Sequence, residues 1–186
     1  MIRSFLRALV ALALLLGSAP LAALADPPAY DDPGMHFAAP PDFEKVDIPP
    51  TDPRGSDQSE DPTPVAAFVY HKGKIDERVI SISVARFDGP VSEFATSHIT
   101  QARQNGDTFV AKNEKTTLQN GMPAVFLKVD SGATAGNFLQ RFEYLVCDGT
   151  RSIAVAYVGP QGTFSEDAAK AALASLYVVV YPKRRP

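Results

Sequence analysis

From residue 65 onwards, the pattern of apolar and polar positions changes several times between a strand-like and a helix-like period. Residues 78–87 alternate large apolar with small side chains, in the order Ile80, Ser81, Ile82, Ser83, Val84, Ala85. This period of two predicts a strand with one apolar face and one face of small residues. A second strand-like run, 65–71, precedes it across Lys72-Gly73-Lys74, which is typical of a hairpin turn.

Residues 90–104 have the period of an α-helix instead. Side chains suited to one buried stripe recur every three or four positions, at Val91, Phe94, Ala95, His98, Ile99 and Ala102. Pro90 is tolerated in the first turn of a helix, and Asn105-Gly106 is a stop signal. The pattern therefore predicts an amphipathic helix over 90–104.

Strand-like runs return in the second half of the chain, at 108–118, 124–130, 138–147 and 152–158. Asn120-Gly121 separates the first two of these runs, and Asp148-Gly149 separates the last two; both are tight-turn dipeptides. Val125, Leu127 and Val129 share one face of their strand. The order of runs and turns predicts an antiparallel meander.

The last predicted element is a helix over 167–176, which is rich in alanine. Thr163-Phe164-Ser165-Glu166 before it has the Ser/Thr-x-x-Glu form of a capping box. Six or seven strands in meander order with two helices indicate an α+β fold: an antiparallel sheet flanked by two helices, in a sandwich, and not a parallel βαβ fold.

The N-terminus has the pattern of an export signal. Arg3 and Arg7 precede the uncharged apolar run 8–17, and Ala23-Leu24-Ala25 is a small-x-small cleavage pattern. An uncleaved membrane anchor is disfavoured, because Gly17, Ser18 and Pro20 break the run before it reaches about 20 apolar residues. We therefore expect residues 1–25 to be a signal peptide, and a single periplasmic or secreted domain over 26–186 without an integral membrane anchor.

Proline and acidic residues collect at the start of that domain. Ten of the 16 prolines lie between residues 27 and 64, and 26–61 holds ten acidic residues against two basic ones. The run 35–39, closed by Pro40-Pro41, suits an edge strand. Residues 48–64 have Ile48 as their only large apolar side chain and predict a mobile acidic surface loop. After signal removal, 16 basic and 21 acidic residues remain, a balance that disfavours nucleic acid as a partner.

Residues 30–40, Tyr-Asp-Asp-Pro-Gly-Met-His-Phe-Ala-Ala-Pro, place an aromatic residue, an acidic turn and a glycine before an extended run that ends in proline. With the paired strands, the helix, the long strand pairs and the C-terminal helix that follow, this order resembles the PsbP/DcrB-like superfamily. The resemblance covers essentially the whole mature chain and implies an α/β/α sandwich. It also implies an exported, non-enzymatic accessory protein, since members include a photosystem II extrinsic subunit and a bacterial periplasmic lipoprotein.

The chain departs from the superfamily pattern at two points. Phe43 stands where many relatives have tryptophan soon after the first strand, and no cysteine lies near residue 25 to carry a lipid. The resemblance implies no catalytic residues.

Few residues offer catalytic chemistry. Cys147, the only cysteine, could form the nucleophile of a thiol-dependent hydrolase with His71 or His98 as base. No local signature of a cysteine enzyme surrounds it, and a free cysteine in a strand beside Leu145 is typically a small buried hydrophobe. His98 lies on the apolar stripe of its helix, which favours a partly buried histidine with one hydrogen bond.

No cofactor or metal site is predicted. Asp31, Asp32 and His36 lack the regular order of a calcium loop. The small-residue loop 131–137 has no lysine and no following helix for a phosphate. The basic residues 183–185 suit a solvated tail.

The sequence thus predicts an exported accessory or binding protein without catalytic activity, which contacts a protein partner in the cell envelope or the envelope surface. A thiol hydrolase and an envelope assembly or stress factor remain alternatives. The sequence does not determine the oligomeric state.

Overall fold

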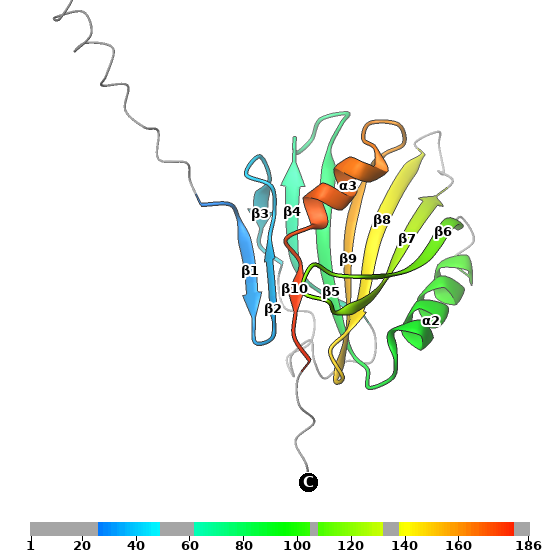
Figure 1. Ribbon diagram of the computed structural model, residues 1–186. Helices are drawn as coiled ribbons and strands as arrows, with labels where there is room; N and C mark the ends of the chain where they lie inside the picture. Colours follow the sequence, from blue (N-terminus) through cyan, green and yellow to red (C-terminus); the bar gives the residue numbers. More distant parts are fainter. Residues whose placement is uncertain (1–25, 49–61, 105–107, 132–137, 181–186) are drawn as a thin grey trace, which may run out of the picture.

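Figure 1 shows the computed structural model, which describes residues 26–48, 62–104, 108–131 and 138–180. The described elements, in chain order, are β1 (Ala29–Asp32), β2 (Met35–Ala38), β3 (Glu44–Val46), β4 (Thr63–Tyr70), β5 (Arg78–Arg86), α2 (Val91–Gln104), β6 (Thr108–Thr117), β7 (Pro123–Ser131), β8 (Leu139–Cys147), β9 (Arg151–Pro160), α3 (Glu166–Leu173) and β10 (Tyr177–Val178).

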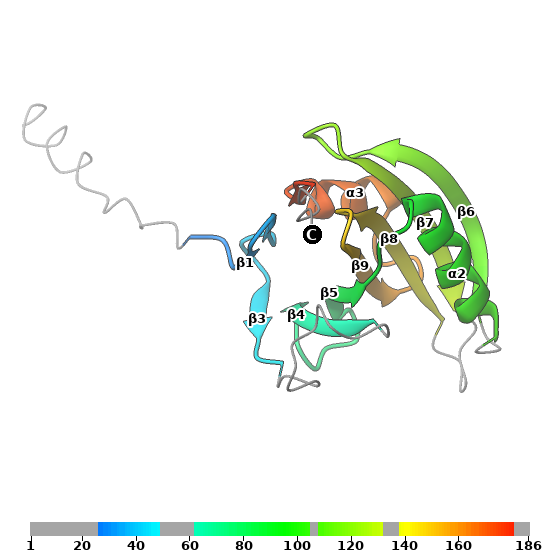
Figure 2. The ribbon, with the colours of Figure 1, turned by 90° about the horizontal axis from the view of Figure 1, so that it is seen from below.

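Seven strands form one antiparallel sheet in the order β3-β4-β5-β9-β8-β7-β6. The sheet consists of two meanders, β3-β4-β5 and β6-β7-β8-β9, joined by hydrogen bonds between β5 and β9. Helix α2 carries the chain from β5 to the far edge at β6. In Figure 2, α2 lies beside β6 and β7 at one end of the sheet, whereas β1 and β3 lie at the other end.

The sheet buries a core on each face. The larger core lies under α3 and contains Ile153, Val155 and Tyr157 of β9. The smaller core lies under α2, which packs on β6, β7 and β8, and it contains Ala154 of β9. Alternate residues of β9 therefore point to opposite faces. The predicted α+β sandwich is confirmed, with one helix on each face of the sheet.

A second, three-stranded sheet has the order β1-β2-β10 and covers the larger core beside α3. Its middle strand is β2, so the prediction of an edge strand at 35–39 is wrong. Strand β10 pairs with the side of β2 that faces away from β1. Tyr177 lies opposite His36, and Val178 lies opposite Met35. Strands β1, β3 and β10 are two to four residues long, too short for a recognisable period.

The predicted loop 48–64 is too long at its C-terminal end, because β4 already begins at Thr63. Pro64 is compatible with this strand because the register shifts between Pro64 and Ala66, and because β3 pairs only with residues 67–69 of β4.

Outside the described residues lie the segments 1–25, 49–61, 132–137 and 181–186. The predicted signal peptide, the rest of the acidic loop, the small-residue loop beyond Ser131 and the basic tail are therefore not placed.

The C-terminal helix α3 begins after Ser165, whose hydroxyl accepts a hydrogen bond from the backbone N–H of Ala168 at 3.2 Å. Ser165 is thus the N-cap, and the predicted capping box that starts at Thr163 is wrong. The Thr163 hydroxyl donates instead to the carbonyl oxygen of Pro160 at 2.7 Å.

Within the described part of the chain, no helix combines the length and the hydropathy needed to cross a bilayer.

Candidate functional site

Cys147 lies at the end of β8 and packs, half-buried, against the smaller core. Burial raises the pKa of its thiol to about 12, and the nearby charge of Asp148 contributes to the same shift. Because the thiolate is the nucleophilic form, a thiol that stays protonated at neutral pH is a poor nucleophile.

The two histidines considered as its base are engaged elsewhere. His71 lies in the turn after β4, where its Nδ1 contacts the carboxylate of Asp76 at 2.9 Å and its ring stacks on Tyr70. His98 pairs with Glu143, which precedes Cys147 by four positions in β8, about 13 Å along a strand. The structure does not bring Cys147 together with either histidine as a thiol hydrolase requires.

His98 and Glu143 connect helix α2 to the sheet. The Nε2 atom of His98 lies 2.8 Å from Oε2 of Glu143, and Arg141 forms an ion pair with the same carboxylate. Glu143 is only 2% exposed, so its charge needs these partners. His98 is partly buried with a hydrogen bond to Glu143, in agreement with the sequence-based interpretation. Glu143 could have been suspected from its acidic side chain within the apolar strand 138–147.

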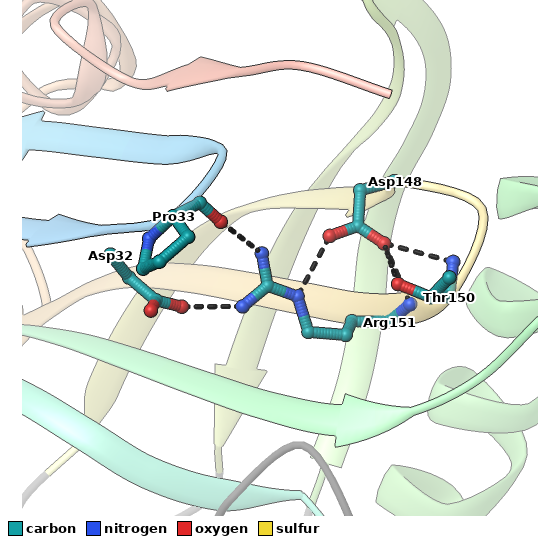
Figure 3. A network of polar contacts seen from close by, with 5 residues as sticks. All are labelled: Asp32, Pro33, Asp148, Thr150 and Arg151. Atoms are coloured by element: carbon teal, nitrogen blue, oxygen red, sulfur yellow. Dashed lines mark hydrogen bonds and ion pairs between the residues drawn. The ribbon is translucent and has the colours of Figure 1, made fainter. Parts of the chain in front are cut away.

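A second polar network fastens the N-terminal hairpin to the turn between β8 and β9 (Figure 3). The guanidinium of Arg151 donates to Asp148 at 2.7 Å and to the carbonyl oxygen of Pro33 at 3.0 Å, and it pairs with Asp32. The other carboxylate oxygen of Asp148 accepts from the backbone N–H groups of Thr150 and Arg151. All of these polar groups satisfy one another, which is the arrangement of a structural tie.

The same network separates the three residues considered for a metal. Asp32 faces Arg151, whereas the carboxylate of Asp31 lies 2.6 Å from Nδ1 of His36 on the surface. Among the residues that the structure describes, no three His, Cys, Asp or Glu side chains are grouped so that they could hold a metal ion.

The feature best suited to binding is a pocket of about 610 Å³. It lies where β5 and β8 begin and β9 ends. We call it the apolar-rimmed pocket. Six apolar residues line it: Ile75, Val79, Phe138, Leu139, Val158 and Pro160. Val79 and Val158 face each other across β5 and β9 and alternate with Ile80 and Tyr157 of the larger core, so they form a floor on the α2 side of the sheet.

The rim of this pocket exposes large apolar side chains to solvent. Ile75 is 96% exposed, Phe138 56% and Leu139 40%. Ile75 comes from the turn between β4 and β5. Phe138 directly precedes β8 and Leu139 begins it, more than 60 positions later in the chain. The sequence signal is a lone isoleucine in a turn of charged residues; only the fold places it beside the start of β8.

A second pocket, of about 450 Å³, lies between α2 and the ends of β5 and β9. Its lining is more polar and includes Ser97, His98, Gln101 and Gln104 of α2. His98 also pairs with Glu143, so the pocket borders the tie between the helix and the sheet.

The sequence matches no protein-family model and no curated protein. Its structure is similar to that of cyanobacterial PsbP from Synechocystis sp. PCC 6803, with a TM-score of 0.56 and 13% identity over 88% of this chain and 98% of that chain. LpqN of Mycobacterium tuberculosis, described as involved in cell envelope biogenesis, gives a TM-score of 0.55 and 13% identity over 81% and 90% of the two chains.

A Pseudomonas aeruginosa protein of unknown function is also similar, with a TM-score of 0.50 and 17% identity over 68% of this chain and 85% of that one. At such identities a structural likeness shows the fold alone. The solved structures agree with the resemblance drawn from residues 30–40 and from the order of elements: the chain has a PsbP-like fold.

Proposed function

We propose that this protein is an exported, non-catalytic accessory protein of the cell envelope, which acts by binding a partner at the apolar-rimmed pocket. The fold that it shares with LpqN and cyanobacterial PsbP supports an envelope-associated role without enzymatic activity. A role in envelope assembly or in the stress response is a narrower form of the same proposal.

The observation that carries the proposal is the exposure of Ile75, Phe138 and Leu139 around one pocket. Each Å² of apolar surface removed from water contributes roughly 25 cal/mol, so three such side chains favour a partner that covers them. Apolar residues gathered around a hollow are typical of interaction sites, whereas apolar residues scattered singly over a surface are ordinary.

The Cys147 alternative receives no comparable support. A nucleophilic thiol needs a base within hydrogen-bond reach and a lowered pKa, whereas burial raises the pKa of Cys147 and both candidate histidines contact carboxylates. The apolar-rimmed pocket does not include Cys147 or a histidine among its lining residues.

The test is a crosslinking and capture experiment on intact cells that express the tagged full chain. The double variant Ile75→Ser, Phe138→Ser should lose the envelope component that the wild type captures. Val180→Ser is the matched control, because Val180 is 62% exposed but lies after β10, outside the pocket lining. Equal capture by the double variant, or an enzymatic activity that Cys147→Ala abolishes, would contradict the proposal.

Export has its own test. N-terminal sequencing of the tagged protein recovered from the cell envelope or the medium should start at Asp26. A first residue of Met1, or retention of the protein in the cytoplasm, would show that residues 1–25 do not act as a cleaved signal.

A further inference from the structure

We propose that the apolar-rimmed pocket binds the acyl chain of an anionic amphiphile, a fatty acid or an acidic phospholipid, and that Lys74 holds the acidic headgroup. This inference rests on the proposed function and names the chemical class of the partner. Three properties of the pocket carry it: an apolar floor without free backbone groups, an exposed apolar rim, and a cation at the edge.

The floor favours an acyl chain over a peptide. Val79 and Val158 lie in neighbouring central strands, β5 and β9, whose backbone groups bond to the adjacent strands of the sheet. A bound peptide would bring an N–H and a C=O group with every residue, and each would need a partner. An acyl chain brings neither, so a floor of valine side chains suits it.

The rim extends the apolar surface on both sides of this floor. Ile75 stands on the β4–β5 turn, and Phe138 and Leu139 lie at the start of β8, which pairs with the other side of β9. A pocket of about 610 Å³ is within the range of roughly 300–1,000 Å³ that small-molecule sites occupy. A single acyl chain on the floor would be covered from the sides by these three side chains.

Lys74 is the cation at the edge of the pocket, and it is the group that would hold an anionic head. Lys74 lines the pocket and is exposed, and among the interactions described it makes no ion pair. Glu77 also lines the pocket and keeps its negative charge, but its carboxylate accepts the backbone N–H of Gly73 at 2.5 Å; the carboxylate of Asp76 contacts His71 at 2.9 Å. Lysine side chains attract acidic lipid headgroups at a membrane surface, so the ammonium group of Lys74 is available for a carboxylate or a phosphate.

The first test uses isothermal titration of the mature protein with decanoate below its micelle concentration and with decanol, which has no charge. The wild type should bind one decanoate per chain. Lys74→Glu should weaken decanoate binding about tenfold and change decanol binding less than twofold. Ile75→Ser with Phe138→Ser should weaken both ligands at least tenfold.

The matched control is Lys115→Glu, the same charge reversal on an exposed lysine of β6, outside the lining of this pocket. Circular dichroism and thermal melting of each variant exclude loss of the fold as the cause. No saturable binding of decanoate, or equal weakening by Lys115→Glu and Lys74→Glu, would overturn the proposal.

The second test distinguishes the two sources of the amphiphile by flotation with vesicles. An acidic phospholipid is identified if the protein binds decanoate and also floats with vesicles that contain phosphatidylglycerol, but not with pure phosphatidylcholine vesicles. A free fatty acid is identified if the protein binds decanoate but floats with neither kind of vesicle. Vesicle binding without decanoate binding would overturn the pocket assignment, because the bilayer contact would then not use the pocket. In that event, a protein captured from the envelope and lost in the double variant would still support the proposed function.

Discussion

Arg151 of β9 and Asp32 of β1 form an ion pair although 119 positions separate them in the chain. The same guanidinium donates to Asp148, which is fully buried, and to the carbonyl oxygen of Pro33. One side chain therefore holds the N-terminal hairpin, the β8–β9 turn and the large sheet together.

Replacing Arg151 should destabilise the protein strongly. Arg151→Met removes the charge that faces Asp148, and a buried carboxylate left without its partner costs about 3 kcal/mol. Asp32→Asn should cost only about 1 kcal/mol, because Asp32 is partly exposed and Arg151 keeps Asp148. Urea unfolding followed by circular dichroism measures both values. Equal effects of the two variants would mean that Asp148 does not depend on Arg151.

Glu143 should be the residue that fixes helix α2 on the sheet. Glu143→Ala leaves both His98 and Arg141 without their shared carboxylate and should lower the free energy of unfolding by about 3 kcal/mol. Glu143→Gln keeps an acceptor for His98 and should cost less. Glu44→Ala, an exposed position in β3, serves as the control and should change stability by less than about 0.5 kcal/mol. The prediction fails if all three variants unfold at the same urea concentration.

Glu166 should give stability a dependence on pH. Its carboxylate accepts hydrogen bonds from Lys112 at 2.6 Å and Lys170 at 2.7 Å, and these bonds lower its pKa, that of Lys112 having the larger effect. A lowered pKa in the folded state stabilises the protein fully at pH values above the ordinary glutamate pKa of about 4.3. This stabilisation is lost as the pH falls through the lowered pKa of the folded state.

Wild type and Glu166→Gln are therefore to be compared by urea unfolding at pH 7 and at pH 2.5. The variant should be less stable by about 0.5–1 kcal/mol at pH 7 and equal to the wild type at the acidic end. A difference that persists unchanged at pH 2.5 would show that the glutamine acts through packing and not through the lost charge.

Cys147 should be a slow thiol. With its pKa raised to about 12, the folded protein holds about 10³-fold less thiolate at pH 8 than an unfolded chain with an ordinary cysteine pKa. Labelling with an aromatic disulfide at pH 8 should therefore be at least about a hundredfold slower in buffer than in 8 M urea. Cys147→Ala should cost about 1 kcal/mol of stability and leave binding intact. Equal labelling rates in the two solvents would revive the nucleophile hypothesis.

The start of α3 should depend on Ser165. Ser165→Ala removes the acceptor for the N–H of Ala168 and should cost about 1 kcal/mol. Ser165→Asp should restore that stability, since aspartate is an equally good N-cap. Thermal melting of the two variants decides the matter, and an alanine variant as stable as the aspartate variant would contradict the assignment of the cap.

The sequence by itself determined the elements whose evidence is local. The alternation of Ile80, Ile82 and Val84 with small residues predicted β5, and the spacing of Phe94, His98 and Ile99 predicted α2, because a period of two or of 3.6 depends only on the backbone geometry of the element itself. Asn120-Gly121 marked the turn between β6 and β7, where Gly121 has a φ of 82°, a conformation that glycine adopts without strain.

The tertiary structure decided which distant segments meet. The pairing of β5 with β9, the pairing of β10 with β2, and the approach of Ile75 to Phe138 join residues far apart in the chain. No local pattern encodes such contacts, since a strand with one apolar face is compatible with several neighbours. The choice among them follows from burying both faces of the whole sheet at once, so the ion pair of Arg151 with Asp32 and the apolar-rimmed pocket appear only after the chain has folded.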